Sequence, residues 1–172
     1  LPSNSDLTAA EVKLLDLPMR DKRLSLALEP IRNEYDYIFI DCPPSLSMLT
    51  VNALVAANSV LVPLQTEYYA LEGLSSLLST IQQIKEHRNP GLEIEGIVRT
   101  MHDPRNNLAT QVSAQLINHF GDKVYRTVIP RNVRVAEAPS HGIPVMQYDR
   151  SSRGAISYLA LASEMARRNQ PQ

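Results

Sequence analysis

The stretch that most constrains the fold of this chain is residues 35–45, Tyr-Asp-Tyr-Ile-Phe-Ile-Asp-Cys-Pro-Pro-Ser. Four apolar residues, 37–40, lead into Asp41, and two prolines then stop the segment. A continuous apolar run predicts a strand buried on both faces, as in a parallel sheet that helices cover. A carboxylate at the carboxyl end of such a strand lies where open α/β sheets bind ligands. In phosphate-binding folds it holds Mg²⁺, directly or through water, so we expect that role for Asp41.

The glycines of the chain do not form a phosphate-binding loop. None of the six glycines belongs to a glycine-rich loop that ends in Lys-Ser or Lys-Thr, and Gly121-Asp122-Lys123 is the only place where glycine and lysine are neighbours. A phosphate loop supplies backbone N–H groups and a lysine. The sequence therefore indicates one half of a nucleotide site without the other.

Apolar periodicity predicts strands that alternate with helices. We expect strands at 37–41, 59–64, 94–101 and 124–129, and a long irregular segment at 131–148. We expect helices at 8–17, 21–33, 47–57, 71–88, 108–120 and 152–168, with Thr8 and Glu11 forming a capping box at the start of the first. Such alternation predicts an α/β fold in three layers, with a parallel sheet flanked by helices.

Charge is unevenly distributed along the chain. The net charge is −1 overall, but residues 96–134 hold six Lys or Arg and two Asp, a local charge of +4. Such a region suits an anionic partner, and a solvated polar face is the alternative. The four histidines show no metal-ligand spacing, and we read each as a surface or loop residue.

Cysteine content and hydropathy narrow the class of protein. Cys42 is the only cysteine, so one chain cannot form a disulfide framework or a multi-cysteine metal site, which suits a reducing cytoplasm. No apolar run approaches the ~18 residues of a membrane helix. The chain starts at Leu1 without an initiator Met, and we expect it to be part of a longer protein.

Several segments together resemble the ParA/Soj family of chromosome- and plasmid-partition ATPases. They cover essentially the whole chain, in order, and comprise residues 1–4, 10–11, 35–45, 50–54, 65–74, 103–108, 128–134 and 137–142. The resemblance implies a P-loop NTPase-like fold of the deviant Walker A class. It also implies that residues 1–172 are a single ATPase domain, truncated at its amino end. The phosphate loop, the first strands and the catalytic aspartate of the family would then precede Leu1, so we assign no catalytic residue within this chain.

The resemblance assigns nucleotide-binding roles to residues that follow strands. Asp41 matches the Walker B position and would hold Mg²⁺ beside the phosphates of ATP. Glu67 matches an acid that reaches the ribose in the partner subunit. The loops that would flank adenine are Thr100-Met101 and Pro130-Arg131-Asn132, with the Asn132 amide reading the base edge. Each residue also has an alternative role. Asp41 could instead cap a helix, Glu67 could be a solvated loop acid, and the two loops could be ordinary turns at strand ends.

Two arginines match positions that resemble the family's nonspecific DNA contacts, Arg105 and Arg134. Phosphate contacts need positive charge and no base-reading geometry. Arg131, Arg126 and Lys123 would widen the basic patch, and surface solubility is the alternative role for all five.

The resemblance therefore implies a Mg²⁺- and ATP-dependent partition ATPase that is cytoplasmic and nucleoid-associated. It would form an ATP-dependent homodimer, bind nonspecific double-stranded DNA and be stimulated by a ParB-type protein. A MinD-like membrane-associated positioning ATPase is one alternative, disfavoured by the polar end at residues 166–172, and an inactive fragment without ATP binding is another. A metabolic or metal-cluster relative is disfavoured by the single cysteine and by the Arg-rich loop at residues 130–134.

Overall fold

The computed structural model describes residues 6–43 and 45–170. Residues 1–4 and Pro44, which contribute to the resemblance, lie outside the described residues. The chain divides into two compact units, unit 1 with residues 1–60 and 78–93, and unit 2 with residues 61–77 and 94–172. The expectation of a single domain stays a prediction, because two compact units within one chain do not establish which parts fold independently.

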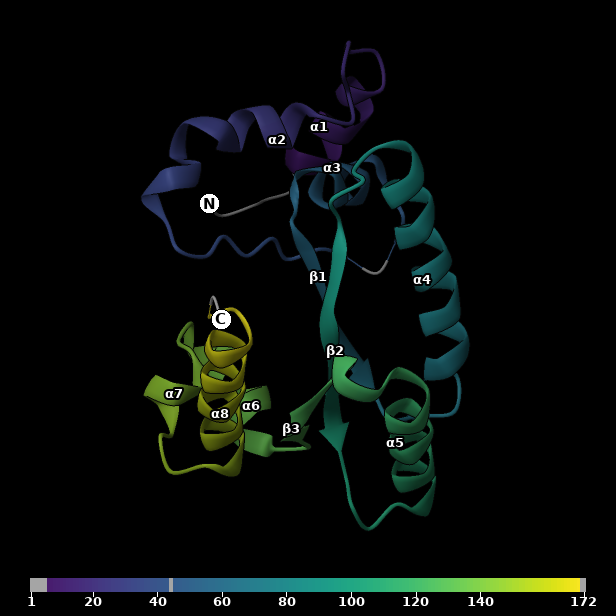
Figure 1. The fold of residues 1–172 in the computed structure, drawn as a ribbon. Helices are drawn as coiled ribbons and strands as arrows, with labels where there is room; N and C mark the ends of the chain where they lie inside the picture. The colour runs from purple at the N-terminus through teal and green to yellow at the C-terminus, as the bar shows by residue number, and fades with distance from the viewer. Residues whose placement is uncertain (1–5, 44, 171–172) are drawn as a thin grey trace. The chain divides into compact units, whose positions relative to one another are not determined.

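The elements run from a helical segment into alternating strands and helices (Figure 1). The first are α1 (Asp6–Leu14), α2 (Arg23–Leu28), the 3₁₀-helix η1 (Glu29–Glu34) and α3 (Met48–Ala56). Next come β1 (Ser59–Gln65), α4 (Ala70–His87), β2 (Glu93–His102), α5 (Asn107–Phe120), η2 (Gly121–Lys123) and β3 (Val124–Pro130). The last are α6 (Val133–Glu137), η3 (Ala138–His141), α7 (Val145–Tyr148) and α8 (Arg153–Arg168).

Most of the expected elements are confirmed. β1, β2, β3, α3, α4, α5 and α8 each agree with the expected range to within one residue at either end. Ser47 caps α3 by accepting from the N–H groups of Leu49 and Thr50. Gly121 ends α5 with φ +51°, a conformation that favours glycine. Strong periodicity and clear end signals account for this agreement.

The three strands form a parallel sheet in the order β1–β2–β3 (Figure 1). Parallel neighbours need long crossover connections, and α4 and α5 supply them. The parallel sheet and its flanking helices confirm the α/β fold class.

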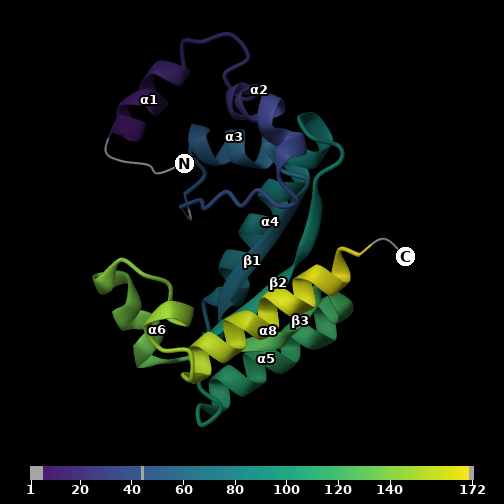
Figure 2. The ribbon, with the colours of Figure 1, turned by 90° about the vertical axis from the view of Figure 1, so that its left-hand side faces the viewer.

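Different helices cover the two faces of β2 and β3 in unit 2. Val98 and Tyr125 pack with Met165 of α8. Arg99, the next residue along β2, donates instead to the hydroxyl of Ser113 on α5. Successive side chains of a strand point to opposite faces, so α8 and α5 lie on opposite sides of the strands (Figure 1). Figure 2 shows α8 running alongside β3. Unit 2 therefore has the expected three layers.

The expected strand at 37–41 is wrong. These residues are irregular chain, and the side chains of Tyr37 and Phe39 are 48% and 72% exposed. Their rings stack on each other at 6.2 Å between centroids. A buried strand needs a hydrogen-bonded neighbour, and no described strand pairs with this segment. Apolar composition alone does not supply that neighbour.

The capping box expected at the first helix is also wrong. α1 starts at Asp6, so Thr8 lies inside it and not at its N-cap. The Glu11 carboxylate accepts from the backbone N–H of Met48 at 2.9 Å, at the start of α3. The Glu11 carboxylate therefore makes a tertiary contact with α3 and not the local hydrogen bond of a capping box.

The helix expected at 21–33 divides into two. α2 ends at Leu28, and η1 takes up residues 29–34 with Pro30 in its first turn. Proline has no N–H and its ring opposes the preceding carbonyl, so a regular α-helix does not continue through this position. The apolar stripe of Leu24, Leu28 and Ile31 is half-buried, as the periodicity predicts.

Residues 131–148 are not irregular. They form α6, η3 and α7, whose core consists of Ala138 and Val145 packed with Ala155 of α8. Helices of four and five residues are too short to leave a periodic apolar pattern. Packing against α8, which no local sequence signal reveals, stabilises these short turns.

Two asparagines join segments within unit 1. Asn52 of α3 is 3% exposed, and its amide donates to the carbonyl of Arg20 at 2.7 Å and accepts from the N–H of Leu24 at 3.1 Å. The amide of Asn89 donates to the carbonyls of Leu54, in the last turn of α3, and of Ala57, which follows that helix. Backbone groups of these turns thus find partners that helix ladders do not provide.

Candidate functional site

The carboxyl ends of the three strands meet at one edge of the sheet in unit 2. β1 ends at Gln65 and leads into Thr66 and Glu67, β2 ends at His102, and β3 ends at Pro130. Open α/β sheets bind ligands at this edge. We call residues 66–67, 100–102 and 130–132 the strand-end edge, and it contains most of the residues expected to bind nucleotide.

Hydrogen bonds connect the three loops of the strand-end edge. The hydroxyl of Thr66 lies 3.2 Å from Nδ1 of His102, which joins the end of β1 to that of β2. The carbonyl of His102 accepts from the backbone N–H of Arg131 at 3.1 Å, which joins β2 to the residue after β3. The structure thus brings together the segments that carry Glu67, Met101 and Arg131.

Met101 has an unusual backbone conformation within this edge. Its φ is +52°, in the left-handed region, and its side chain is 49% exposed. The pairing of β2 with β3 advances three residues from Arg99 to His102 but only two from Val128 to Pro130, so β2 bulges there. Bulges occur beside active sites, where they re-aim a side chain. Here the bulge directs Met101 away from the core.

Asn132 caps a helix that sequence analysis did not foresee. Its side-chain oxygen accepts from the N–H of Val135 at 3.2 Å, at the start of α6. Gly154 packs against this residue, and a Cβ at Gly154 would lie 3.1 Å from the Asn132 oxygen. The cap therefore uses the side-chain oxygen of Asn132. Hydrogen bonding of the Asn132 amide to the edge of adenine stays a prediction.

Glu67 is exposed and lies beside a shallow groove of 330 Å³ between β1 and the start of α4. Tyr69, Leu74 and Leu77 also line the groove. Tyr68 and Tyr69 meet edge to face at 5.3 Å and are 70% and 75% exposed, so they do not pack into the core. Contact of Glu67 with a ribose stays a prediction.

Asp41 lies in the irregular segment of unit 1 and is exposed. The described residues contain no group of three or more His, Cys, Asp or Glu side chains arranged to hold a metal ion. Mg²⁺ is often bound by one or two carboxylates, with phosphate oxygens and water completing its shell. A lone Asp41 fits that mode and does not fit an all-protein metal site. Partial desolvation, followed by the charge of Asp41, raises the pKa of the Cys42 thiol, which disfavours a reactive thiolate.

Arg105 forms a bidentate ion pair with Asp103. Its Nη2 lies 2.7 Å and its Nε 3.0 Å from the two carboxylate oxygens, while 88% of the arginine side chain stays exposed. The side-chain and backbone hydrogen bonds from Arg105 lower the pKa of Asp103 to about 2. The guanidinium is therefore accessible but already has an anionic partner.

Arg134 is also paired with acids. Its Nη1 lies 2.8 Å from Glu137, and its Nε lies 3.5 Å from Asp149. Tyr148 donates to the same Glu137 oxygen at 3.2 Å and stacks on His141. The hydrogen bond from Arg134 lowers the pKa of Glu137, against the effect of desolvation. The second predicted DNA contact thus also has internal carboxylate partners.

The basic region at 96–134 contributes less surface charge than its sequence indicates. Arg99 is 8% exposed, so its charge does not reach the surface, whereas Lys123 is exposed and donates to the carbonyl of Ile94 at 2.8 Å. Lys123, Arg126 and Arg131 are exposed and, with Arg105 and Arg134, remain candidates for a basic patch.

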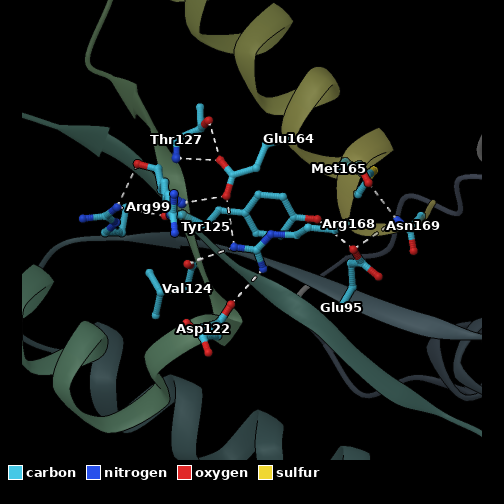
Figure 3. Close-up of polar contacts among 11 residues, drawn as sticks. Glu95, Arg99, Asp122, Val124, Tyr125, Thr127, Glu164, Met165, Arg168 and Asn169 are labelled. Atoms are coloured by element: carbon cyan, nitrogen blue, oxygen red, sulfur yellow. Dashed lines mark hydrogen bonds and ion pairs between the residues drawn. The ribbon is translucent and has the colours of Figure 1, made fainter. Parts of the chain in front are cut away.

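A polar network that sequence analysis missed joins α8 to β3 (Figure 3). Glu164 accepts from the backbone N–H groups of Arg126 and Thr127, each at 2.8 Å, and from the Thr127 hydroxyl at 2.7 Å. Arg168 completes the pair with Glu164 at 3.0 Å and lies 4.0 Å from the Tyr125 ring centroid. The Tyr125 hydroxyl donates to Glu95 at 2.8 Å.

This network satisfies the backbone of a second bulge. Pairing advances two residues from Ile97 to Arg99 but four from Val124 to Val128, so β3 carries two extra residues. Arg99 donates to the carbonyls of Tyr125 and Arg126, while Glu164 accepts from N–H groups in the same stretch. Side chains thus replace the interrupted ladder. Nε of Arg99 has no hydrogen-bond partner among the described residues.

The network shifts the titration of its members. Burial raises the pKa of Glu164, but the hydrogen bonds from Thr127, Arg126 and Arg168 outweigh it and lower that pKa to about 2. Burial, followed by the bond to Glu95, raises the pKa of Tyr125. One sequence signal could have revealed the network, namely a charged residue within an apolar stripe, as Arg99 is in β2 and Glu164 is in α8.

Comparison with known proteins places the chain in a family. The family model described as an AAA domain matches residues 1–94. The sporulation initiation inhibitor protein Soj of Bacillus subtilis is 54% identical over 166 residues, covering 96% of this chain and 66% of its own length. The chromosome-partitioning ATPase Soj of Treponema pallidum is 48% identical, covering 98% of this chain and 67% of its own length. The chain belongs to the ParA/Soj family.

A solved structure extends the ParA/Soj assignment to the fold. Cobyrinic acid a,c-diamide synthase from Mycobacterium smegmatis, with bound ATP analog and magnesium, matches with a TM-score of 0.79 and 34% identity, covering 97% of this chain and 61% of that one. The chain spans 61–67% of the length of the curated relatives it matches. Family membership confirms the resemblance drawn from the sequence. Within residues 6–43 and 45–170, no helix is both long and apolar enough to span a bilayer.

Proposed function

We propose that the protein containing this chain is a partition ATPase that uses Mg²⁺ and ATP to segregate chromosomal or plasmid DNA. The observation that carries the proposal is the 54% identity with Soj across 96% of the chain. The strand-end edge supports it, because the loops expected to bind nucleotide lie at the carboxyl ends of a parallel sheet.

In this proposal the strand-end edge binds ATP. Thr100, Met101 and the Pro130–Asn132 loop flank the adenine, and Glu67 accepts from ribose hydroxyls in the partner subunit. Asp41 holds Mg²⁺, which neutralises charge on the phosphates when bound. The ATP analog and magnesium in the diamide synthase structure support this choice of cofactors.

The proposal assigns Arg105 and Arg134 to nonspecific DNA binding. Both are exposed enough to reach phosphates. Counterion release by arginine–phosphate contacts makes such binding fall steeply with salt. ATP would promote a homodimer, which would present two copies of these arginines, and a ParB-type protein would stimulate hydrolysis and release the DNA. The proposed function implies a protein that is cytoplasmic and associated with the nucleoid.

The test measures binding of a nonspecific duplex DNA to the protein at its natural full length, with and without Mg²⁺ and ATP, at two salt concentrations. Arg134→Gln and Arg105→Gln are compared with Arg88→Gln, a matched control because Arg88 is 57% exposed and pairs with Asp21 at 2.9 Å. We expect ATP to switch on salt-sensitive binding, and the first two variants, unlike the control, to weaken it. DNA binding that does not depend on ATP, or an equal loss of DNA affinity in all three variants, would contradict the proposal.

A further inference from the structure

We propose that His102 is a positioning residue for nucleotide binding, which through Thr66 and Arg131 holds the three loops of the strand-end edge in one arrangement. The inference rests on the proposed function, because it concerns the same edge. It adds a residue that family resemblance does not assign and that the sequence alone presents as an ordinary loop histidine.

The first step is the contact between the side chains of Thr66 and His102. Thr66 is 3% exposed, so its hydroxyl is removed from bulk water, and its partner at 3.2 Å is Nδ1 of His102. Either the hydroxyl donates to an unprotonated Nδ1 or it accepts from Nδ1–H. In both cases a buried hydroxyl left without its partner is costly. The contact therefore fixes the residue next to Glu67 relative to the end of β2.

The second step is the backbone of His102. Its carbonyl accepts from the N–H of Arg131 at 3.1 Å, and its position in the sheet register is opposite Pro130. A displacement of His102 would therefore move the start of the Pro130–Asn132 loop. One residue thus contacts both of the other loops, one through its ring and one through its carbonyl.

The third step is the conformation of Met101. A non-glycine residue in the left-handed region is strained and persists only where its neighbours hold it. Pairing of Arg99 with Val128 holds β2 before Met101, and the contacts of His102 hold the residue after it. Releasing His102 would let Met101 relax toward ordinary strand geometry and turn its half-exposed side chain away from the edge.

The test is a set of three substitutions in the protein at its natural full length. Thr66→Val removes the hydroxyl with little change of shape, and Thr66→Ser retains it. Thr110→Val is the matched control, because Thr110 is exposed on α5 and its hydroxyl donates to the carbonyl of Asn106, the N-cap residue of that helix. Affinities for Mg-ATP and Mg-GTP are measured by calorimetry, unfolding temperatures by circular dichroism, and the ring-nitrogen shifts of His102 by NMR.

We expect Thr66→Val to weaken ATP binding by about tenfold, the equivalent of one lost hydrogen bond, and to narrow the preference for ATP over GTP. Thr66→Ser and Thr110→Val should stay within about twofold of the parent protein. The NMR signals of His102 should change in Thr66→Val alone. If the contact had a purely structural role, Thr66→Val would lower the unfolding temperature and reduce the affinities for ATP and GTP equally.

The inference is overturned if Thr66→Val keeps both the affinity and the preference for ATP, or if the two nucleotides weaken in parallel. In either case ATP binding by the parent protein would leave the proposed function standing. If the parent protein binds neither nucleotide, the proposed function fails and the role of His102 toward a nucleotide fails with it.

Discussion

Glu164 is the side chain on which attachment of α8 to β3 most depends. It is 7% exposed and accepts four hydrogen bonds, two of them from backbone N–H groups that the bulge of β3 leaves without ladder partners. A buried carboxylate without such donors would be strongly destabilising. At the residue scale, the fold of unit 2 therefore relies on a charged group whose ionised form is the stable one.

We predict that Glu164→Gln lowers the free energy of unfolding at pH 7 by about 3 kcal/mol, the value of a carboxyl pKa held at about 2 in place of 4.5. Because the folded-state pKa is lowered, the contribution is complete above the unfolded-state pKa and is lost as pH falls toward 2. Urea unfolding from pH 7 to pH 2 should therefore show the difference between parent and variant shrinking below about pH 4.5. Glu86→Gln, on the exposed face of α4, is the control. A difference that stays constant with pH would contradict the prediction.

A second residue-scale prediction concerns the acids beside Arg134. Glu137 occupies the guanidinium at 2.8 Å, so a DNA phosphate must compete with it. We expect Glu137→Gln to increase the ATP-dependent affinity for duplex DNA by about threefold, because an exposed ion pair typically contributes a free energy of that size. Filter binding at several salt concentrations measures this, with Glu86→Gln as control. Weaker binding in Glu137→Gln would mean that the acid instead orients the arginine.

At the scale of elements, the approach of α6 to α8 positions the loop after β3. Gly154, in the first turn of α8, leaves room for Asn132 and Val135 at the start of α6. A side chain there would meet both residues. The loop that carries Arg131 and Asn132 is therefore fixed partly from α8, which is remote in sequence.

We predict that Gly154→Ala destabilises the protein by about 2 kcal/mol, the usual cost of overpacking a filled site. Gly73→Ala is the matched control, because Gly73 lies within α4 and a Cβ there meets nothing within 4 Å. The control should stabilise the protein by about 1 kcal/mol through helix propensity. Thermal unfolding of both variants measures the effects, and a neutral Gly154→Ala would show that α6 moves freely away from α8.

At the scale of the whole molecule, burial is concentrated in a few elements. α1, α2 and η1 contain no buried residue, and Leu26 is 45% exposed. In β2 and β3, by contrast, Ile97 and Tyr125 are fully buried. Local opening is easiest where few apolar contacts must be broken.

We expect hydrogen exchange to follow this distribution. Backbone amides at 96–99 and 124–129 should exchange slowest, and amides at 6–43 should exchange at least about a hundredfold faster, a difference of roughly 3 kcal/mol in opening free energy. Mass spectrometry of peptic fragments measures this without substitution. Equal protection of both ranges would show that the chain opens as one cooperative unit.

The sequence by itself determined the alternation of strands and helices from Ser59 onward, the helix that precedes it at residues 47–57, and membership of the ParA/Soj family. These rest on local periodicity, end signals and the order of motifs, which need no knowledge of distant contacts. Only the tertiary structure decided that residues 37–41 are irregular chain, that 131–148 is helical, and that Glu11 contacts Met48. It also placed Thr66 against His102 and Glu164 against the bulge of β3. For residues 37–41 the described chain supplies no pairing strand, and in the other cases a partner far along the chain supplies the stabilising contact. Local sequence carries no information about the presence or absence of such a partner.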